Sequence, residues 1–329
     1  MSFYSGRRVL VTGGTGFIGA NLTRALVAAG AKVRVSARRV EHDRLRDAEV
    51  FACDLTDAAQ CLRTVRGMDT IFHLAAHGFG IGANVQAQPE LFTRNTIMCV
   101  NILEAARQGR VERFLLCSSS SVYDGAAEVL DDSKPWTGDP HPSEFGLGWA
   151  KRAAEAQARV YAQHAGMKIA VVRPSNPYGP MDLFDPQRSH VIPAMVLRAL
   201  AREDPFTVWG TGKAQRSFVY VDDLVAGMML ALEKHAVCDP LNLASPERTS
   251  IAEVARKVLA ACRAQDLAIK FDVTKPEGHP GRSPTTGKAK AAIGWEATTP
   301  LDEGIRKTVQ WYLSEGRKAV PSPGGRGLG

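Results

Sequence analysis

A glycine-rich stretch near the N-terminus, TGGTGFIG at residues 12–19, constrains the fold of this chain more than any other feature. It follows the apolar run VLV and precedes a helical pattern at 17–30, so it joins a predicted first strand to a predicted first helix. Its glycines, Gly13, Gly16 and Gly19, allow a tight turn, a close approach of the backbone to a pyrophosphate, and close helix–strand packing. In this position the stretch predicts a dinucleotide-binding turn, whereas a merely glycine-rich turn is the alternative.

Short β-rich runs alternate with helical patterns through the first half of the chain. The runs are VRVSA (33–37), VFAC (50–53), IFHLAA (71–76), FLLCSSSS (114–121) and IAVVRP (169–174), and the clearest helical patterns lie at 89–108 and 149–165. This alternation predicts an α/β fold, a doubly wound parallel sheet with helices on both faces.

The chain changes character after residue 175. A loop rich in Pro and Asp comes first, and helical patterns at 191–202, 222–235, 250–264 and 299–314 then alternate with short strands. We therefore expect four parts: a dinucleotide-binding domain at 1–175, a segment at 218–245 that returns to it, a smaller interleaved α/β substrate lobe at 176–217 and 246–317, and a flexible tail at 318–329.

Composition narrows the choice of partners and compartment. The formal net charge is +7, but Lys and Arg are scattered, which disfavours a nucleic-acid partner and suits an anionic small molecule equally well. No apolar run has membrane-spanning length, and the N-terminus lacks the features of a signal peptide. The six cysteines form no CxxC pair, which favours reduced thiols in the cytoplasm over a disulfide framework or a metal site.

The end of the second predicted strand indicates which dinucleotide is bound. NAD enzymes usually carry an acid there for the ribose 2′-hydroxyl, but this chain has Ala37 followed by Arg38 and Arg39. Because Arg can pair with a 2′-phosphate, the sequence favours NADP over NAD. The alternative is that both arginines are solvated loop charges.

From these glycines onward the chain resembles the extended short-chain dehydrogenase/reductases of the NAD-dependent epimerase/dehydratase family. The matching pieces are TGGTGFIG, DLTD (54–57), HLAA (73–76), CSSSSVY (117–123), the helix of Lys151, RPSNPYGP (173–180) and RSFVYVDD (216–223). GIGAN (80–84) and FDPQRSHVIPA (184–194) are most similar to the GDP-L-fucose synthase branch, which epimerises and reduces GDP-4-keto-6-deoxymannose. The resemblance implies a homodimer through the helices at 89–108 and 149–165.

The resemblance also implies a set of cofactor-binding residues. Asp54 and Leu55 would contact the adenine, Asn95 would brace the active-site backbone, and Lys151 would hold the nicotinamide ribose. The full set is Gly13, Gly16, Phe17, Ile18, Gly19, Arg38, Asp54, Leu55, Leu74, Ala75, Ala76, Asn95 and Lys151.

On the substrate side the resemblance implies a nucleotide-diphosphate sugar. Ser119 would hydrogen-bond the C4 oxygen of the sugar, and His190 matches the acid that acts in epimerisation. Asn176, Arg216 and Arg282 would hold the diphosphate, Trp209 would lie near the base, and Ser121 would also face the substrate. The implied catalytic residues are Ser119, Lys151 and His190, and no metal is implied.

Two positions depart from the family pattern. The catalytic tyrosine falls at Leu147, four residues before Lys151, and the cysteine that the fucose synthase branch uses as a base falls at Ser121. Leucine can neither donate nor accept a proton. His141 and Glu144 precede the gap and could supply a proton, although solvated loop residues are the alternative for both.

Four interpretations follow from these departures. The protein is an epimerase or 4-ketoreductase in which Ser119 with a water, or a relay through Lys151 and the ribose, moves the proton. It is an epimerase or lyase that uses His190 with little hydride chemistry. It is a non-catalytic module that binds a nucleotide sugar. Finally, Leu147 is an engineered replacement that traps a substrate. The surviving substrate-side residues favour the first interpretation.

Overall fold

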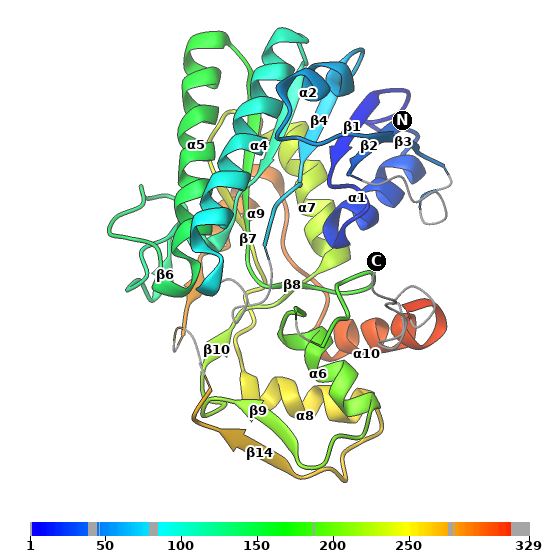
Figure 1. Cartoon of the computed structure of the whole chain (residues 1–329), viewed down its shortest axis with the longest axis vertical. Helices are drawn as coiled ribbons and strands as arrows, with labels where there is room; N and C mark the ends of the chain where they lie inside the picture. Colours follow the sequence, from blue (N-terminus) through cyan, green and yellow to red (C-terminus); the bar gives the residue numbers. More distant parts are fainter. Residues whose placement is uncertain are drawn as a thin grey trace, which may run out of the picture.

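A computed structural model places the chain in two connected lobes (Figure 1). It describes residues 2–38, 45, 47–78, 85–186, 188–275, 279 and 281–316. The larger lobe contains a seven-stranded sheet with helices on both faces, and the smaller lobe lies below it in the view of Figure 1.

The central sheet is parallel throughout, in the order β12-β7-β5-β4-β1-β2-β3. Its strands are β1 Arg8–Thr12, β2 Lys32–Ala37, β3 Glu49–Ala52, β4 Thr70–His73, β5 Arg113–Cys117, β7 Lys168–Pro174 and β12 Leu241–Leu243. From β1 the chain adds β2 and β3 on one side and then β4 and β5 on the other, so the strand order reverses between β1 and β4. In such a fold the ligand crevice lies at the carboxyl ends of these two strands. The predicted doubly wound α/β fold is confirmed.

Apolar residues on successive strand positions supply two cores, one on each face of the sheet. In β1, Val9 and Val11 enter one core while Leu10 enters the other, as the two-residue period of a strand requires. Helices α1 (Phe17–Ala28), α7 (Val221–Lys234) and α9 (Gly287–Ile293) cover the first face. Helices α2 (Ala58–Val65), α4 (Gln88–Gln108) and α5 (Phe145–Ala165) cover the second, and α4 packs along α5.

A third apolar core lies in the smaller lobe. It is formed around α6 (Val191–Leu200), α8 (Ile251–Ala261) and α10 (Leu301–Trp311), which continues into a π-helical turn at Tyr312–Gly316. The remaining strands are paired in twos: β9 (Phe206–Trp209) with β14 (Ile269–Asp272), β10 (Gln215–Arg216) with β13 (Thr249–Ser250), β8 (Pro177–Tyr178) with β11 (Val219–Tyr220), and β6 (Val129–Leu130) with β15 (Ser283–Pro284). The exact domain boundaries remain a prediction.

Three sequence expectations were wrong at their edges. The strand expected at 71–76 ends at His73, and residues 74–76 form a loop. The strand expected at 114–121 ends at Cys117, because the Ser119 hydroxyl accepts the backbone N–H of Ser121 and starts a 3-10 turn at Ser120–Val122. Helix α5 begins at Phe145, four residues before the expected start. The segment at 80–84, Arg39 and the tail at 318–329 lie outside the described residues.

Candidate active site

The turn after β1 has room for nothing larger than glycine at two positions. Gly13 has a φ of 66°, and a Cβ there would lie 2.8 Å from the Cα of Ala75. A Cβ on Gly19 would lie 2.2 Å from the carbonyl oxygen of Gly13. The backbone of the turn is thus pressed against both the β4 loop and the first helix, the close packing that a dinucleotide-binding turn requires.

The N-terminus of α1 carries the partial positive charge of an uncapped helix. Gly16 is its N-cap residue and no side chain caps the first turn, so the first backbone N–H groups, those of Phe17 and Ile18 among them, remain available to an anion. Next to the turn, the Thr12 hydroxyl lies 2.8 Å from Nδ1 of His73, which is buried. Burial, with Lys151 nearby, lowers the pKa of His73 to about 3, so this imidazole is neutral.

Arg38 and Asp54 follow the adjacent strands β2 and β3. The Asp54 carboxylate accepts the backbone N–H and the hydroxyl of Thr56 at 2.9 and 2.8 Å. These bonds, and then the charges of Arg38 and Arg94, lower the pKa of Asp54. Leu55 is buried beside it. The residues assigned to the adenine end of the cofactor therefore share the carboxyl edge of the sheet.

Asn95 fixes the loop that follows β4. From α4 its side chain accepts the backbone N–H of His77 and donates to the carbonyl of His77, both at 2.8 Å, and it also donates to the Leu91 carbonyl at 2.7 Å. Leu74, Ala75 and Ala76 lie directly before this anchor and opposite the glycine turn. Asn95 thus ties the loop after β4 to α4, and the role beside a cofactor that the resemblance implies for it stays a prediction.

Lys151 and Ser119 lie where α5 meets the end of β5. The Lys151 ammonium is buried and donates to the Cys117 carbonyl at 2.7 Å, two residues before Ser119. A Cβ on Gly148 would lie 2.6 Å from the Ser121 carbonyl oxygen, so the first turn of α5 packs directly on the serine turn. Leu147, half-buried, is one helical turn before Lys151 on the same face. The Ser121 hydroxyl is buried and has no partner among the described residues.

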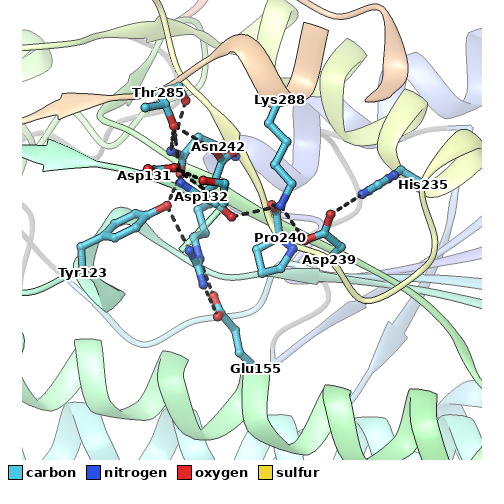
Figure 2. Close-up of polar contacts among 12 residues, drawn as sticks. Tyr123, Asp131, Asp132, Glu155, His235, Asp239, Pro240, Asn242, Thr285 and Lys288 are labelled. Atoms are coloured by element: carbon cyan, nitrogen blue, oxygen red, sulfur yellow. Dashed lines mark hydrogen bonds and ion pairs between the residues drawn. The ribbon is translucent and has the colours of Figure 1, made fainter. Parts of the chain in front are cut away.

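A buried polar network lies behind this serine turn (Figure 2). Glu155, one turn after Lys151, accepts from Arg173 at 2.9 and 2.6 Å and from the Ser118 hydroxyl at 2.5 Å. Arg173 continues to the Tyr123 hydroxyl, which donates to Asn242 of β12 at 2.7 Å. The network therefore ties α5, β7 and β12 to the segment that follows β5.

His190 and Asp182 form a carboxylate–imidazole pair at the start of α6. Nδ1 of His190 lies 3.4 Å from Oδ1 of Asp182, and the His190 side chain is 54% exposed while that of Asp182 is 1% exposed. The hydrogen bond to Asp182 raises the pKa of His190, against the opposing effect of burial. The second Asp182 oxygen is buried without a partner among the described residues. An exposed imidazole with a raised pKa suits proton transfer near neutral pH.

The residues assigned to the diphosphate come from three segments that meet between the lobes. The Asn176 amide donates to the Ser217 carbonyl at 2.9 Å, one residue after Arg216. A bridge between Gln215 and Gly281 places Arg216 and Arg282 on neighbouring segments. Trp209 lies apart from them in sequence, at the end of β9, where its ring is 49% exposed and 5.9 Å from the Lys275 ammonium.

Sequence reasoning missed Asp182, Glu155 and Arg173. Glu155 and Arg173 lie on different elements, 18 residues apart in the sequence. Asp182 lies eight residues before His190, a spacing that belongs to no known motif. In the part of the chain described, no three His, Cys, Asp or Glu side chains gather as metal ligands would. None of the described helices combines the length and apolar character needed to cross a bilayer.

Sequence relatives of this chain include enzymes of more than one activity. It is 30% identical over 316 residues to GDP-mannose 3,5-epimerase 1 of Oryza sativa subsp. japonica, covering 94% of this chain and 82% of the relative. It is 32% identical over 328 residues to dTDP-4-dehydro-6-deoxy-D-allose reductase of Streptomyces bikiniensis (94% and 97% covered). GDP-L-fucose synthase of Dictyostelium discoideum is 29% identical over 321 residues (94% and 96% covered).

Solved structures agree with the fold, and one family profile covers most of the chain. UDP-glucose 4-epimerase of Thermotoga maritima superposes with a TM-score of 0.83 at 25% identity, covering 95% of this chain and 99% of that one. A GDP-6-OMe-4-keto-L-xylo-heptose reductase from C. jejuni gives 0.86 at 18% identity, with 96% and 100% covered, and supports the fold alone. The profile of the NAD dependent epimerase/dehydratase family matches residues 9–244. With its glycine turn, its Ser119–Lys151 arrangement and this match, the chain belongs to the NAD dependent epimerase/dehydratase family.

Proposed function

We propose that this protein is an NADP-dependent epimerase or 4-ketoreductase of nucleotide-diphosphate sugars that works with a non-standard proton donor. One observation supports the proposal most directly: Lys151 and the serine turn lie together beside Leu147. Lys151 is buried and bonded to the strand end that carries Ser119, and α5 packs on the serine turn at Gly148.

The glycine turn and the uncapped α1 N-terminus fit the pyrophosphate of a dinucleotide, and Arg38 at the end of β2 fits a 2′-phosphate. The bound dinucleotide supplies a hydride donor or acceptor. Lys151 holds the ribose, and Ser119 donates a hydrogen bond to the C4 oxygen of the sugar. Because Leu147 has no proton to give, a water on Ser119, or Lys151 acting with the ribose of the bound dinucleotide, would carry the proton.

The substrate class follows from the charge of the crevice and from the named activities of the relatives. GDP-mannose, GDP-fucose and dTDP-sugar enzymes all resemble this chain over nearly its full length. Arg216, Arg282 and the Asn176 segment provide donors for a diphosphate. Asn176 adopts a φ of 40°, a left-handed conformation that Asn tolerates better than most residues.

Restoring the tyrosine tests the proposal. The Leu147→Tyr variant would place a hydroxyl on the face of α5 that carries Lys151, next to the serine turn. We expect it to raise the rate of NADPH oxidation with a 4-keto nucleotide sugar by about 100-fold, the usual value of a positioned acid. GDP-4-keto-6-deoxymannose and its dTDP-linked counterpart are the substrates, and absorbance at the nicotinamide band is the readout.

A matched control separates chemistry from packing. Leu147→Phe fills the same space without a hydroxyl, so the proposal requires that it gain nothing. Equal rates for the Tyr and Phe variants and the unmodified protein would contradict a hydride step limited by proton supply.

A second function is favoured by the Asp182–His190 pair. An exposed imidazole held by a buried carboxylate can exchange a proton beside a ketone, as in an epimerase or lyase with little hydride chemistry. In that case His190→Ala abolishes deuterium incorporation next to the ketone from D₂O, while Leu147→Tyr has no effect or obstructs the sugar. The same substrates distinguish the two functions. A non-catalytic nucleotide-sugar module would show neither effect.

We also propose a homodimer formed through α4 and α5. Their outer faces expose Phe92, Val100 and Val160, at 42%, 45% and 53%. Apolar side chains in such a group indicate a protein contact. Light scattering after gel filtration should give twice the mass of one chain for the unmodified protein. The double variant Val100→Lys/Val160→Lys should give the mass of a single chain. The six cysteines are free thiols, which supports a cytoplasmic location.

A further inference from the structure

A cluster of five basic side chains lies between the lobes, and we call it the basic cluster: Arg216, Arg248, Arg282, His141 and His279. Strand β10 is its centre, since Arg216 is opposite Thr249 of β13 and Gln215 is bridged to Gly281. A Cβ on Gly281 would lie 3.2 Å from Nη2 of Arg248. The three guanidinium groups therefore project from three neighbouring segments of backbone.

The two imidazoles of the cluster face each other, although 138 residues separate them in the sequence. Their ring centroids are 6.2 Å apart with planes inclined at 73°. Burial first, and then the charges of Arg282 and Arg216, lower the pKa of both His141 and His279, while Glu144 acts in the opposite direction on His141. The lowered pKa favours the uncharged form of both rings at neutral pH.

Contacts at Nδ1 favour one tautomer of each ring. The N–H of Ser143 donates to Nδ1 of His141 at 3.3 Å, and the Ser143 hydroxyl lies 2.8 Å from the same nitrogen. The N–H of Gly281 donates to Nδ1 of His279 at 3.1 Å. A ring nitrogen that accepts an N–H carries no proton of its own, so the proton of each neutral ring is on Nε2. Each histidine thus offers one uncharged N–H donor on the side of the ring away from its backbone bond.

The Arg282 guanidinium keeps one donor without a partner among the described residues. Its side chain is 12% exposed, and its Nη1 lies 4.0 Å from Glu144. Nη2 donates to the Asp124 carbonyl at 3.3 Å, and Nε is buried without a partner among the described residues. Glu144 and Asp124 are the carboxylates that act on it. A buried guanidinium with an unused donor points to an anionic ligand.

We propose that His141 and His279 are ligand-binding residues that hold a diphosphate together with Arg216 and Arg282, through uncharged Nε2–H donors. The proposal rests on the proposed function, which makes the nucleotide sugar the source of the diphosphate. Neutral donors suit this position because they add hydrogen bonds to the phosphate oxygens without adding repulsion among the arginines. A fourth and fifth cation packed there would raise that repulsion.

Calorimetric titration at pH 8 with inorganic pyrophosphate, and separately with GDP, tests the assignment. We expect His141→Ala and His279→Ala each to weaken both ligands about tenfold or more, the usual effect of losing a hydrogen bond to a charged group. His→Gln places an amide N–H close to the position of Nε2 and should recover most of the affinity, whereas His→Asn should not. His164→Ala, on the exposed last turn of α5, is the matched control and should change nothing.

The assignment is overturned if the Ala variants bind pyrophosphate as the unmodified protein does, or if the Gln variants lose as much affinity as the Ala variants. Melting temperatures measured without ligand identify any Ala variant that is unfolded. In that case the affinities of the Gln variants decide whether the assignment holds. Failure of the proposed function is separately visible. A protein that binds pyrophosphate through both imidazoles but converts no 4-keto nucleotide sugar contradicts the reaction and leaves this site standing.

Discussion

Glu155→Gln should destabilise the protein strongly, because it removes one half of a buried ion pair and leaves the other. Both side chains of the Glu155–Arg173 pair are 3% exposed. The carboxylate has four donors, two from Arg173 and one each from Ser118 and Trp136. Removing one partner of such a pair leaves an uncompensated charge in the interior, which typically costs about 3–5 kcal/mol in the free energy of unfolding.

The assay is urea denaturation followed by far-ultraviolet circular dichroism, with Glu155→Gln, Arg173→Met and the double variant Glu155→Gln/Arg173→Met. The double variant should lose less than the sum of the single losses, because neither charge is then left alone. Strictly additive losses, or a loss of less than about 1 kcal/mol for Glu155→Gln, the value of an exposed pair, would refute the reasoning.

The same pair predicts how stability depends on pH. Burial opposes ionisation of Glu155, but the bonds from Arg173, Ser118 and Trp136 outweigh it, so its pKa lies below the usual value. A carboxyl with a lowered folded-state pKa contributes stability above its unfolded pKa, about 4.3, and loses that contribution as the pH falls through the folded value. Acid unfolding of the unmodified protein should therefore be steep below about pH 4, and Glu155→Gln should flatten it.

Three further predictions concern the crevice. Asp182→Asn removes the charge beside His190 and should lower the His190 pKa, measured by NMR or as a shift toward lower pH of the activity limit that His190 controls; an unchanged pKa would mean that the pair has no electrostatic role. Arg38→Ala should remove most of the preference for NADPH over NADH in calorimetry, and equal affinities in the unmodified protein would contradict the choice of NADP. Gly19→Ala puts a Cβ 2.2 Å from the Gly13 carbonyl oxygen and should weaken dinucleotide binding about tenfold or more. Gly287→Ala is its control, since a Cβ there meets nothing within 4 Å.

The sheet was predictable because its strands and helices follow local rules. Short apolar runs mark β1, β5 and β7, and the glycine motif marks the turn between the first strand and the first helix. Tertiary packing did not override these local signals. The early start of α5 was hidden by Gly146 and Gly148, which have poor helix propensity. Both are needed for contact: a Cβ on Gly146 would lie 2.2 Å from the Gln88 carbonyl oxygen, and one on Gly148 would clash with Ser121. Packing there outweighs propensity.

The site was predictable only where a motif carries it. Lys151 and Ser119 lie in runs whose order matches the family, and the structure brings them to one strand end. The pairs His190–Asp182, Glu155–Arg173 and His141–His279 depend on loops or on segments far apart in the chain. No spacing within the sequence encodes such contacts, because they arise when the two lobes and the sheet edge come together.

Strand β12 has a consequence for how the chain folds. It closes the edge of the sheet beside β7, yet it is made of residues 241–243, which follow α6 and the first strands of the smaller lobe. Asn242 in this strand also completes the hydrogen bonds of Tyr123. A fragment that stops after β7 would leave that strand edge unpaired and the face covered by α7 open to water. Folding of the larger lobe thus requires a long loop closure through the smaller one, and we expect the two to unfold as a single cooperative unit despite their separate cores.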